Sequence, residues 1–167
     1  KTYGAIFVRT GDSKVSSEAD LDGKSLIVLK ADLAHDYAIS KGWQPNLVLV
    51  ADTAEGLRLL GSGKHDAMLV NKLVGLQTLR ETGIKDVKPL PVQLPFFQKF
   101  GFAVRKGDAA MLADINEGLA IVKANGTYDD LYEKWFGVLD PKEMTLLAAV
   151  KVAAPYLLPF AVFLMVV

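Results

Sequence analysis

The chain has 167 residues, of which 51% are hydrophobic; its 19 Lys and Arg balance 19 Asp and Glu, and it contains no cysteine. The lack of cysteine excludes disulfides, thiolate zinc sites and cysteine nucleophiles, and the even charge with no basic run argues against a nucleic-acid partner. Much of the hydrophobic excess lies in residues 144–167, and the remainder has the composition of an ordinary globular domain.

Short apolar runs alternate with helical segments from the start of the chain. Strands are predicted at Tyr3–Arg9, Leu26–Leu29, Leu47–Val50 and Met68–Val70. Helices are predicted at Leu33–Lys41, after the N-cap candidate Asp32, at 52–60, with Asp52 as cap, and at Lys72–Thr82, ended by Gly83. Wholly apolar strands are typical of parallel sheets buried on both faces. We therefore predict an α/β fold with a largely parallel sheet.

The second half of the domain continues with less regular signals. Val87–Leu94 reads as extended but is broken by prolines, and Phe100–Arg105 reads as another strand. A helix is predicted near Ala109–Ala124, followed by a turn and a short final helix. We expect Trp135 and Phe136 of that last helix to be buried as core anchors.

The chain ends in a stretch, residues 144–167, that is apolar except at Thr145, Lys151, Pro155 and Pro159. A bilayer core about 30 Å thick is crossed by about 20 residues of helix, so this stretch is long enough to span a membrane. We predict a domain over residues 1–140, a short linker at 141–143 and a truncated transmembrane helix; a buried helix or an apolar hairpin is the alternative. Since the chain opens on Lys1 and a strand begins almost at once, we expect a piece of a longer membrane protein.

Four segments, taken in this order, carry a family resemblance: ADLDGKSLIVL, TAEGLRLLGSGKHDAMLVN, FGFAVRKGD and ANGTYDDLYEKWFG. Together they resemble the type 2 periplasmic solute-binding proteins, in the family-3 or amino-acid-binding branch. The resemblance implies a two-lobed Venus-flytrap fold. This chain would hold the second lobe, at about residues 11–97, and the C-terminal part of the first lobe, whose N-terminal part is missing.

A domain of this kind followed by a membrane helix is similar to the sensor domains of bacterial signalling proteins that carry a histidine kinase or diguanylate cyclase. The resemblance implies a bacterial inner-membrane protein with residues 1–143 in the periplasm or outside the cell, sensing a small polar, amino-acid-like ligand by lobe closure. Three alternatives stay open: a membrane-anchored binding component of an amino-acid ABC transporter, a periplasmic dehydratase-like enzyme, and a module that only binds other proteins. Signalling relatives often work as dimers, which leaves a homodimer open.

The turn after the strand Leu26–Leu29 is the first candidate for ligand contact. In transporter relatives it usually reads x-G-T and presents backbone N–H groups to a ligand carboxylate; the matching residues here are Ala31 and Asp32. A carboxylate at this point repels an anionic ligand, so Asp32 either caps its helix or contacts the ligand directly. His35 shares a helix face with Asp32 and either binds a polar ligand or lies on the surface. Lys30 either reaches into the cleft or is solvated.

The second candidate is Asn71, which stands where the family often has an aspartate that pairs with the ligand's ammonium. An amide brings no charge, and this again argues against a standard zwitterionic amino acid. Phe96, Phe97 and Phe100 either stack on a ligand or pack in the core, and we interpret Asp66 as structural, holding the turn into its strand.

Nothing in the sequence indicates catalysis. It contains no G-x-S-x-G elbow, P-loop, dinucleotide-binding glycine motif or paired histidine motif, so we predict no catalytic residues and no cofactor for this segment. His35 and His65 are its two histidines, and no third ligand candidate stands at a suitable spacing, so no metal site is expected. We interpret His65 as a solvated turn residue.

Overall fold

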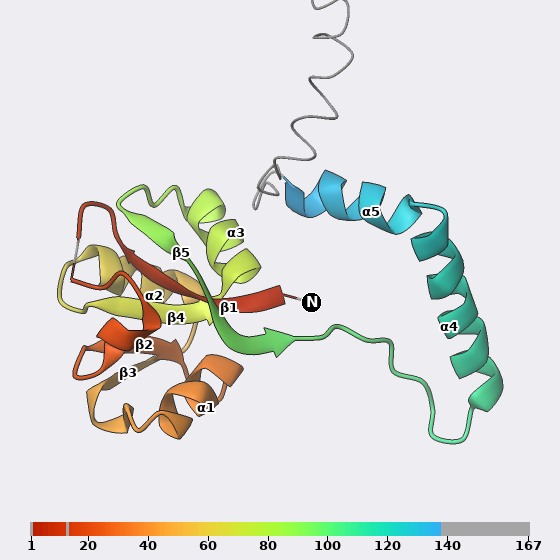
Figure 1. The fold of residues 1–167 in the computed structure, drawn as a ribbon, viewed down its shortest axis with the longest axis horizontal. Helices are drawn as coiled ribbons and strands as arrows, with labels where there is room; N and C mark the ends of the chain where they lie inside the picture. Colours follow the sequence, from red (N-terminus) through yellow and green to blue (C-terminus); the bar gives the residue numbers. More distant parts are fainter. Residues whose placement is uncertain (1, 13, 138–167) are drawn as a thin grey trace, which may run out of the picture.

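The computed structural model describes residues 2–12 and 14–137 of the chain. Residues 2–98 form one sheet with helices on both faces, called the sheet unit below. The helices α4 and α5 form an arm beside it (Figure 1). The arm consists of α4 (Ala109–Ala124), α5 (Thr127–Tyr132) and a final π-helical turn, η3 (Glu133–Gly137).

The sheet has five strands in the order β3 (Leu47–Val50), β2 (Leu26–Leu29), β4 (Ala67–Asn71), β1 (Thr2–Arg9) and β5 (Val87–Gln98). β2 runs parallel to β3 and β4, whereas β1 runs antiparallel to both of its neighbours, β4 and β5. The prediction of a largely parallel sheet is therefore wrong, because half of the strand pairs are antiparallel. The sequence does not distinguish the two cases, since a strand buried on both faces is apolar throughout in either orientation.

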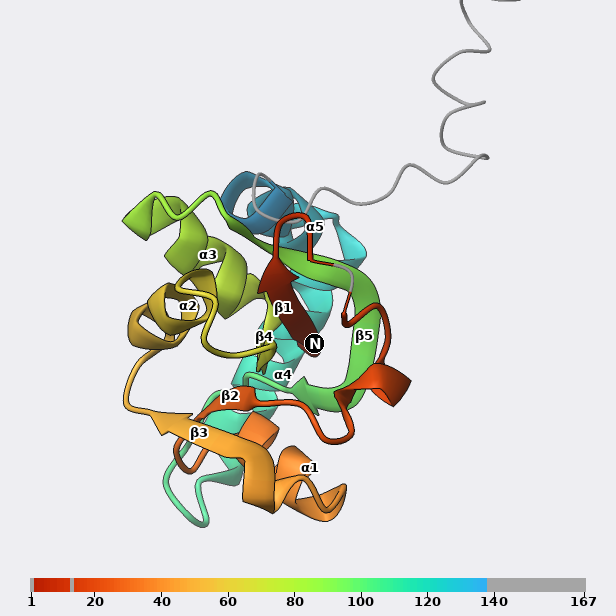
Figure 2. The ribbon, with the colours of Figure 1, turned by 90° about the vertical axis from the view of Figure 1, so that its left-hand side faces the viewer.

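Three helices cover the sheet: α1 (Leu33–Ser40), α2 (Thr53–Gly61) and α3 (Lys72–Thr82). Alternate residues of each strand point to opposite faces, so Ile6 and Val28 pack with α1 while Phe7 and Ile27 pack with the α2–α3 side. Figure 2 shows α1 apart from the α2–α3 pair, with the sheet between them. The short predicted strands and these three helices are confirmed to within a residue or two at each end.

Two glycines let neighbouring elements lie in direct contact. A Cβ at Gly75 of α3 would stand 2.3 Å from the ring of Phe7, and a Cβ at Gly4 of β1 would stand 2.1 Å from the ring of Phe96. Helix α3 therefore rests directly on β1. The ring of Phe96 crosses over β1 and reaches Tyr37 of α1, with ring centroids 5.1 Å apart.

Strand β5 continues to Gln98, beyond the predicted end at Leu94, and contains three prolines, at 89, 91 and 95. It lies at one edge of the sheet, where residues without an N–H are tolerated. The prolines also remove donors that could pair with a strand of another molecule.

The chain after β5 differs from the expectations in two respects. Residues 100–105 form no strand, because a strand needs a partner for its backbone groups and none of the described strands lies beside them. Trp135 and Phe136 are 66% and 39% exposed, so their predicted burial is wrong within the part that the structure describes. Both rings line a pocket beside α3.

The predicted linker and transmembrane helix, residues 141–143 and 144–167, lie outside the described residues. Of the helices that the structure describes, none is long and apolar enough to cross a bilayer.

Candidate functional site

The helices α1, α2 and α3 begin at the end of the sheet where β2, β3 and β4 finish. This end is called the carboxyl edge below, to distinguish it from the outer strand β5. Because β2, β3 and β4 are parallel, their carboxyl ends meet there, and each strand passes almost directly into a helix. Ligands of open α/β sheets bind outside the carboxyl ends of the strands, where helix N-termini supply unpaired N–H groups. All five sequence-predicted site residues lie at this edge: Lys30, Ala31, Asp32 and His35 after β2, and Asn71 at the end of β4.

The turn after β2 has an unusual backbone. Ala31 has φ +60° and is the single non-glycine residue with positive φ among residues 2–12 and 14–137. L-residues seldom adopt this conformation, and such strain gathers at functional positions. The Ala31 N–H donates to Nδ1 of His35 at 3.2 Å, so His35 folds back over the turn. The backbone donor that the sequence assigned to a ligand is therefore occupied by a side chain of the same turn.

Asp32 stands at the N-cap of α1, as predicted, but its side chain accepts no capping hydrogen bond. Asp52 at the start of α2 does cap its helix, through an Oδ1 that accepts the N–H of Glu55 at 2.8 Å. The half-buried Asp32 carboxylate has no hydrogen-bond or ion-pair partner among the described residues. Lys30 is exposed, and its N–H donates to the carbonyl of Val50 at 3.0 Å.

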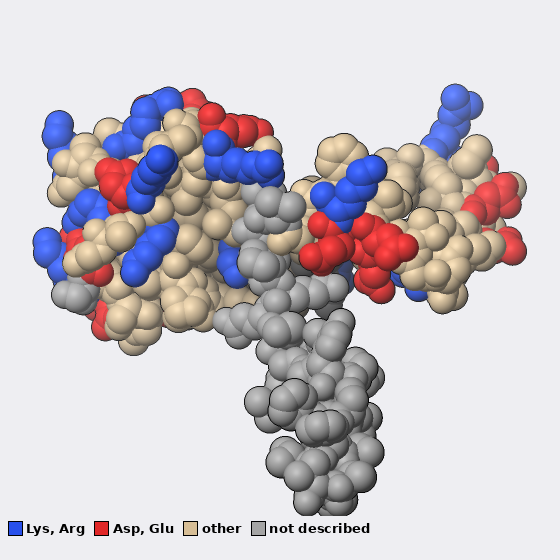
Figure 3. All heavy atoms as spheres, turned by 90° about the horizontal axis from the view of Figure 1, so that it is seen from above, with Lys and Arg blue, Asp and Glu red and all other residues tan. Residues whose placement is uncertain are grey.

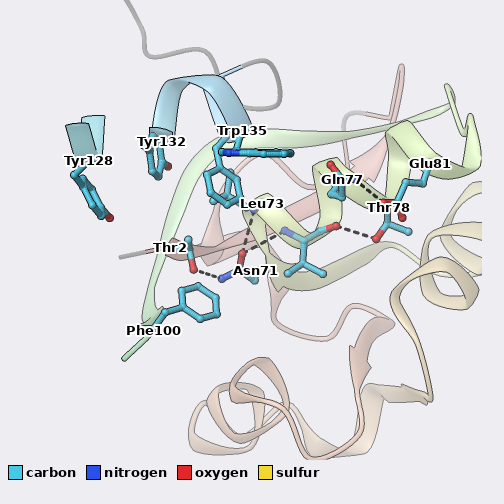
Figure 4. A pocket seen from close by; sticks show the side chains of 12 residues that line it. Thr2, Asn71, Leu73, Gln77, Thr78, Glu81, Phe100, Tyr128, Tyr132 and Trp135 are labelled. Atoms are coloured by element: carbon cyan, nitrogen blue, oxygen red, sulfur yellow. Dashed lines mark hydrogen bonds between the residues drawn. The ribbon is translucent and has the colours of Figure 1, made fainter. Parts of the chain in front are cut away.

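Asn71 is 5% exposed and uses both ends of its amide. Its Oδ1 accepts the N–H groups of Leu73 and Val74 at 3.1 and 3.4 Å, which caps α3. Its Nδ2 donates to Oγ1 of Thr2 at 2.5 Å (Figure 4). The same Nδ2 donates to Oε1 of Gln98 at 3.1 Å. Asn71 thus joins α3 to the outer ends of β1 and β5. No local feature of the sequence predicts Thr2 or Gln98 as its partners.

A pocket of about 620 Å³ opens beside Asn71, between α3 and the arm. Figure 4 shows the aromatic rings of Tyr128, Tyr132 and Trp135 on the arm side, opposite Asn71 and α3, and Phe100 below them. The structure brings Asn71 to this pocket, whereas Lys30, Ala31, Asp32 and His35 do not line it. Phe100 is 81% exposed, so it is not a core residue of the described part.

A cluster around Tyr37 of α1 fixes the position of that helix. The hydroxyl of Tyr37 donates to Oε1 of Glu18 at 2.5 Å, and Nζ of Lys41 lies 2.7 Å from the same oxygen. Burial and the neighbouring Glu18 raise the pKa of Tyr37, while hydrogen bonds from Lys41 and Tyr37 lower the pKa of Glu18. The Tyr37 ring also contacts Trp43 and Phe96. These contacts hold the Ala31–His35 turn in place relative to the sheet.

The residues at the start of β4 have structural roles. Oδ2 of Asp66 accepts the N–H of Ser25 at 3.0 Å, in agreement with its interpretation as the residue that holds this turn. His65 is half-buried with Nδ1 2.8 Å from Oγ of Ser25, so its interpretation as a solvated residue is wrong. Both lie at the end of the sheet opposite the candidate site.

Basic side chains are spread over the face of the sheet unit seen in Figure 3 and form no continuous stripe. Among the residues that the structure describes, no group of three or more His, Asp or Glu is placed to hold a metal ion.

Comparison with known proteins identifies the fold. The family described as bacterial extracellular solute-binding proteins, family 3, matches residues 2–138. The ABC transporter glutamine-binding protein GlnH of Bacillus subtilis (strain 168) is 28% identical over 142 residues, which cover 83% of this chain and 50% of GlnH. The L-cystine-binding protein TcyA of the same strain is 28% identical over 137 residues, or 81% of this chain and 50% of TcyA. The chain thus spans about half the length of these curated relatives.

Two solved structures are similar over most of the chain. A histidine kinase sensor domain with similarity to periplasmic binding proteins has 35% identity and a TM-score of 0.69, with 84% of this chain and 61% of that one covered. An ancestral arginine-binding protein bound to arginine has 29% identity and a TM-score of 0.66, with coverages of 82% and 61%. The resemblance drawn from the four sequence segments is confirmed.

Proposed function

The chain belongs to the bacterial extracellular solute-binding proteins, family 3, and from this membership we propose that it is part of the extracytoplasmic ligand-sensing domain of a membrane-bound signalling protein. Its ligand is a small polar compound related to amino acids. The observation that carries the signalling assignment is the likeness to the histidine kinase sensor domain, at 35% identity over 84% of the chain.

The proposed ligand face of this lobe is the carboxyl edge, where α1, α2 and α3 begin. Lys30, Ala31, Asp32 and His35 form its β2–α1 side, and Asn71 forms its β4–α3 side. Asn71 contributes mainly by position, since its own amide is fully hydrogen-bonded. The opposing side of the cleft belongs to the rest of the first lobe.

The proposed mechanism is closure of two lobes around the ligand. A ligand shifts the balance between open and closed states only by as much as its affinities for the two states differ. Closure would move α4, α5 and η3 relative to the sheet unit. The linker at 141–143 and a membrane helix at 144–167 would then carry this movement to an output module, with residues 1–143 on the periplasmic side of the inner membrane.

The binding component of an amino-acid transporter is the second candidate, because GlnH and TcyA are similar over four fifths of the chain. These relatives are binding proteins by name, so no catalytic step is proposed. A gene deletion separates the two candidates. Loss of a ligand-dependent transcriptional response with uptake unchanged supports the sensor, and loss of radiolabelled ligand uptake supports the transporter component.

Binding itself is tested by thermal shift on the full-length protein in detergent, against amino acids, polyamines, small carboxylates and nucleobases. A ligand at about 100 times its dissociation constant stabilises the native state by roughly 2.7 kcal/mol, which is a readily measured shift. A protein that none of these classes stabilises would contradict the proposed ligand-binding function and favour a module that binds other proteins.

A further inference from the structure

Two of the four backbone N–H groups at the turn between β2 and α1, those of Ala31 and Asp32, are already occupied within the turn. The N–H of Ala31 already donates to Nδ1 of His35 at 3.2 Å, and the N–H of Asp32 points to the carbonyl of Leu29 at 3.4 Å. By their position in the first turn of α1, the N–H groups of Leu33 and Ala34 stay without intrahelical partners. The carboxylate of Asp32, directly before Leu33 in the chain, already places a negative charge at this turn.

Of the two acidic side chains at this turn, Asp32 and Asp36, the Asp32 carboxylate is the half-buried one. It does not cap its own helix and pairs with no cation among the described residues. Asn71 at the neighbouring strand end is neutral and its amide is saturated, so it neither repels a cation nor competes for it.

The turn itself carries no net positive charge. The Asp32 carboxylate offsets the single positive charge of the exposed Lys30. Repulsion between two carboxylates in contact is larger than the attraction of a helix N-terminus for an anion, since the latter is a partial charge that solvent screens. An incoming carboxylate is therefore disfavoured at this turn, and a nitrogen that carries hydrogens and a positive charge is favoured.

We infer that the ligand presents a cationic nitrogen, as an amine, amidine or guanidinium, to Asp32, and that it does not place a carboxylate on this lobe. The inference rests on the proposed function and specifies its ligand class. His35 supports this preference for a cation, because its Nδ1 accepts the N–H of Ala31 that could otherwise bind an anion. A carboxylate elsewhere on the ligand would have to be held by the other lobe.

The test compares probes of opposite charge on the full-length protein in detergent, by isothermal titration calorimetry. Agmatine and putrescine carry cationic nitrogens and no carboxylate, and glutarate carries two carboxylates and no nitrogen. We expect agmatine or putrescine to bind and glutarate not to bind. Asp32→Asn should weaken the cationic probe by at least about tenfold, as expected for loss of a charge-assisted hydrogen bond.

The control is Asp36→Asn, because Asp36 is an exposed carboxylate in the same first turn. Asp36→Asn should change the affinity for the cationic probe by less than about twofold. If the probe responded only to the total charge near the helix, both variants would weaken binding by similar factors. Circular dichroism and the melting temperature of each unliganded variant establish that it is folded.

The inference is overturned if glutarate binds and Asp32→Asn leaves that affinity unchanged or tightens it, or if a cationic probe binds Asp32→Asn as well as the native protein. Binding of none of the three probes also counts against it. The broad ligand panel described above then decides separately whether the protein binds small molecules at all.

Discussion

Replacing Asn71 tests whether one buried amide holds three elements together. Its Oδ1 caps α3 through Leu73 and Val74, and its Nδ2 reaches Thr2 in β1 and Gln98 in β5. Loss of an N-cap costs about 1 kcal/mol. Loss of each of the two hydrogen bonds that Nδ2 donates costs about 1 kcal/mol more, because the accepting oxygen is left unpaired in a buried or half-buried setting. Asn71→Ala should therefore lower the free energy of unfolding by about 3 kcal/mol.

A second variant separates the two roles of Asn71. Serine is a good N-cap but is too short to reach Thr2 and Gln98, so Asn71→Ser should cost about 2 kcal/mol. Asp52→Ala is the matched control, because the Asp52 side chain caps α2 through Glu55 and has no further partner among the described residues. It should cost about 1 kcal/mol.

Urea unfolding of the extracytoplasmic domain measures these differences through tryptophan fluorescence. Trp43 is 7% exposed in the core beside α1, whereas Trp135 is 66% exposed on the arm. Of the two tryptophans in this sequence, a Trp135→Phe background leaves Trp43 as the reporter of the sheet unit. If Asn71→Ala costs no more than Asp52→Ala, the bonds to β1 and β5 contribute nothing and this reasoning is refuted.

Three further predictions concern single contacts. Gly75→Ala should lower the melting temperature, because the clash with the buried ring of Phe7 costs about 1–3 kcal/mol and outweighs a helix-propensity gain of about 1 kcal/mol; a rise would contradict the packing. Ala31→Gly should raise stability by up to about 1 kcal/mol in urea unfolding, since relief of positive φ exceeds the added chain entropy, and a loss would count against the strained turn. The lowered pKa of Glu18, due first to Lys41, gives stability that is present above pH 4.5 and lost as pH falls below it; Glu18→Gln should flatten this part of the stability–pH curve, and an unchanged curve would exclude the pair as its cause.

Much of the fold follows from local signals in the sequence. Leu26–Leu29 and Lys72–Thr82 have the predicted bounds, because an apolar run of four marks the first and Gly83, at φ +70°, ends the second. The direction of β1 does not follow, since its pattern fits a buried strand of either orientation. The predicted strand at 100–105 failed because an apolar run becomes a strand only beside a partner, which local sequence does not reveal.

The candidate site, like the fold, is predicted by the sequence only in part. That Asp32 and Asn71 stand at helix starts directly after strands follows from the sequence, because an apolar run precedes each of them and a helical segment follows. Their partners do not follow, because the bond from Ala31 to His35 depends on a positive φ. The partners of Asn71, Thr2 and Gln98, stand 69 and 27 residues away in the chain. Contacts of that kind are set by tertiary packing.

The pairing of Thr2 with Gln98 places the two ends of the sheet unit next to each other. The chain thus enters and leaves this unit through adjacent strands, and everything between them is one contiguous segment with its own core. Segments with neighbouring ends tolerate excision and insertion well. Residues 2–98 can therefore be exchanged between relatives as one block, which would replace the whole candidate site and leave the arm unchanged.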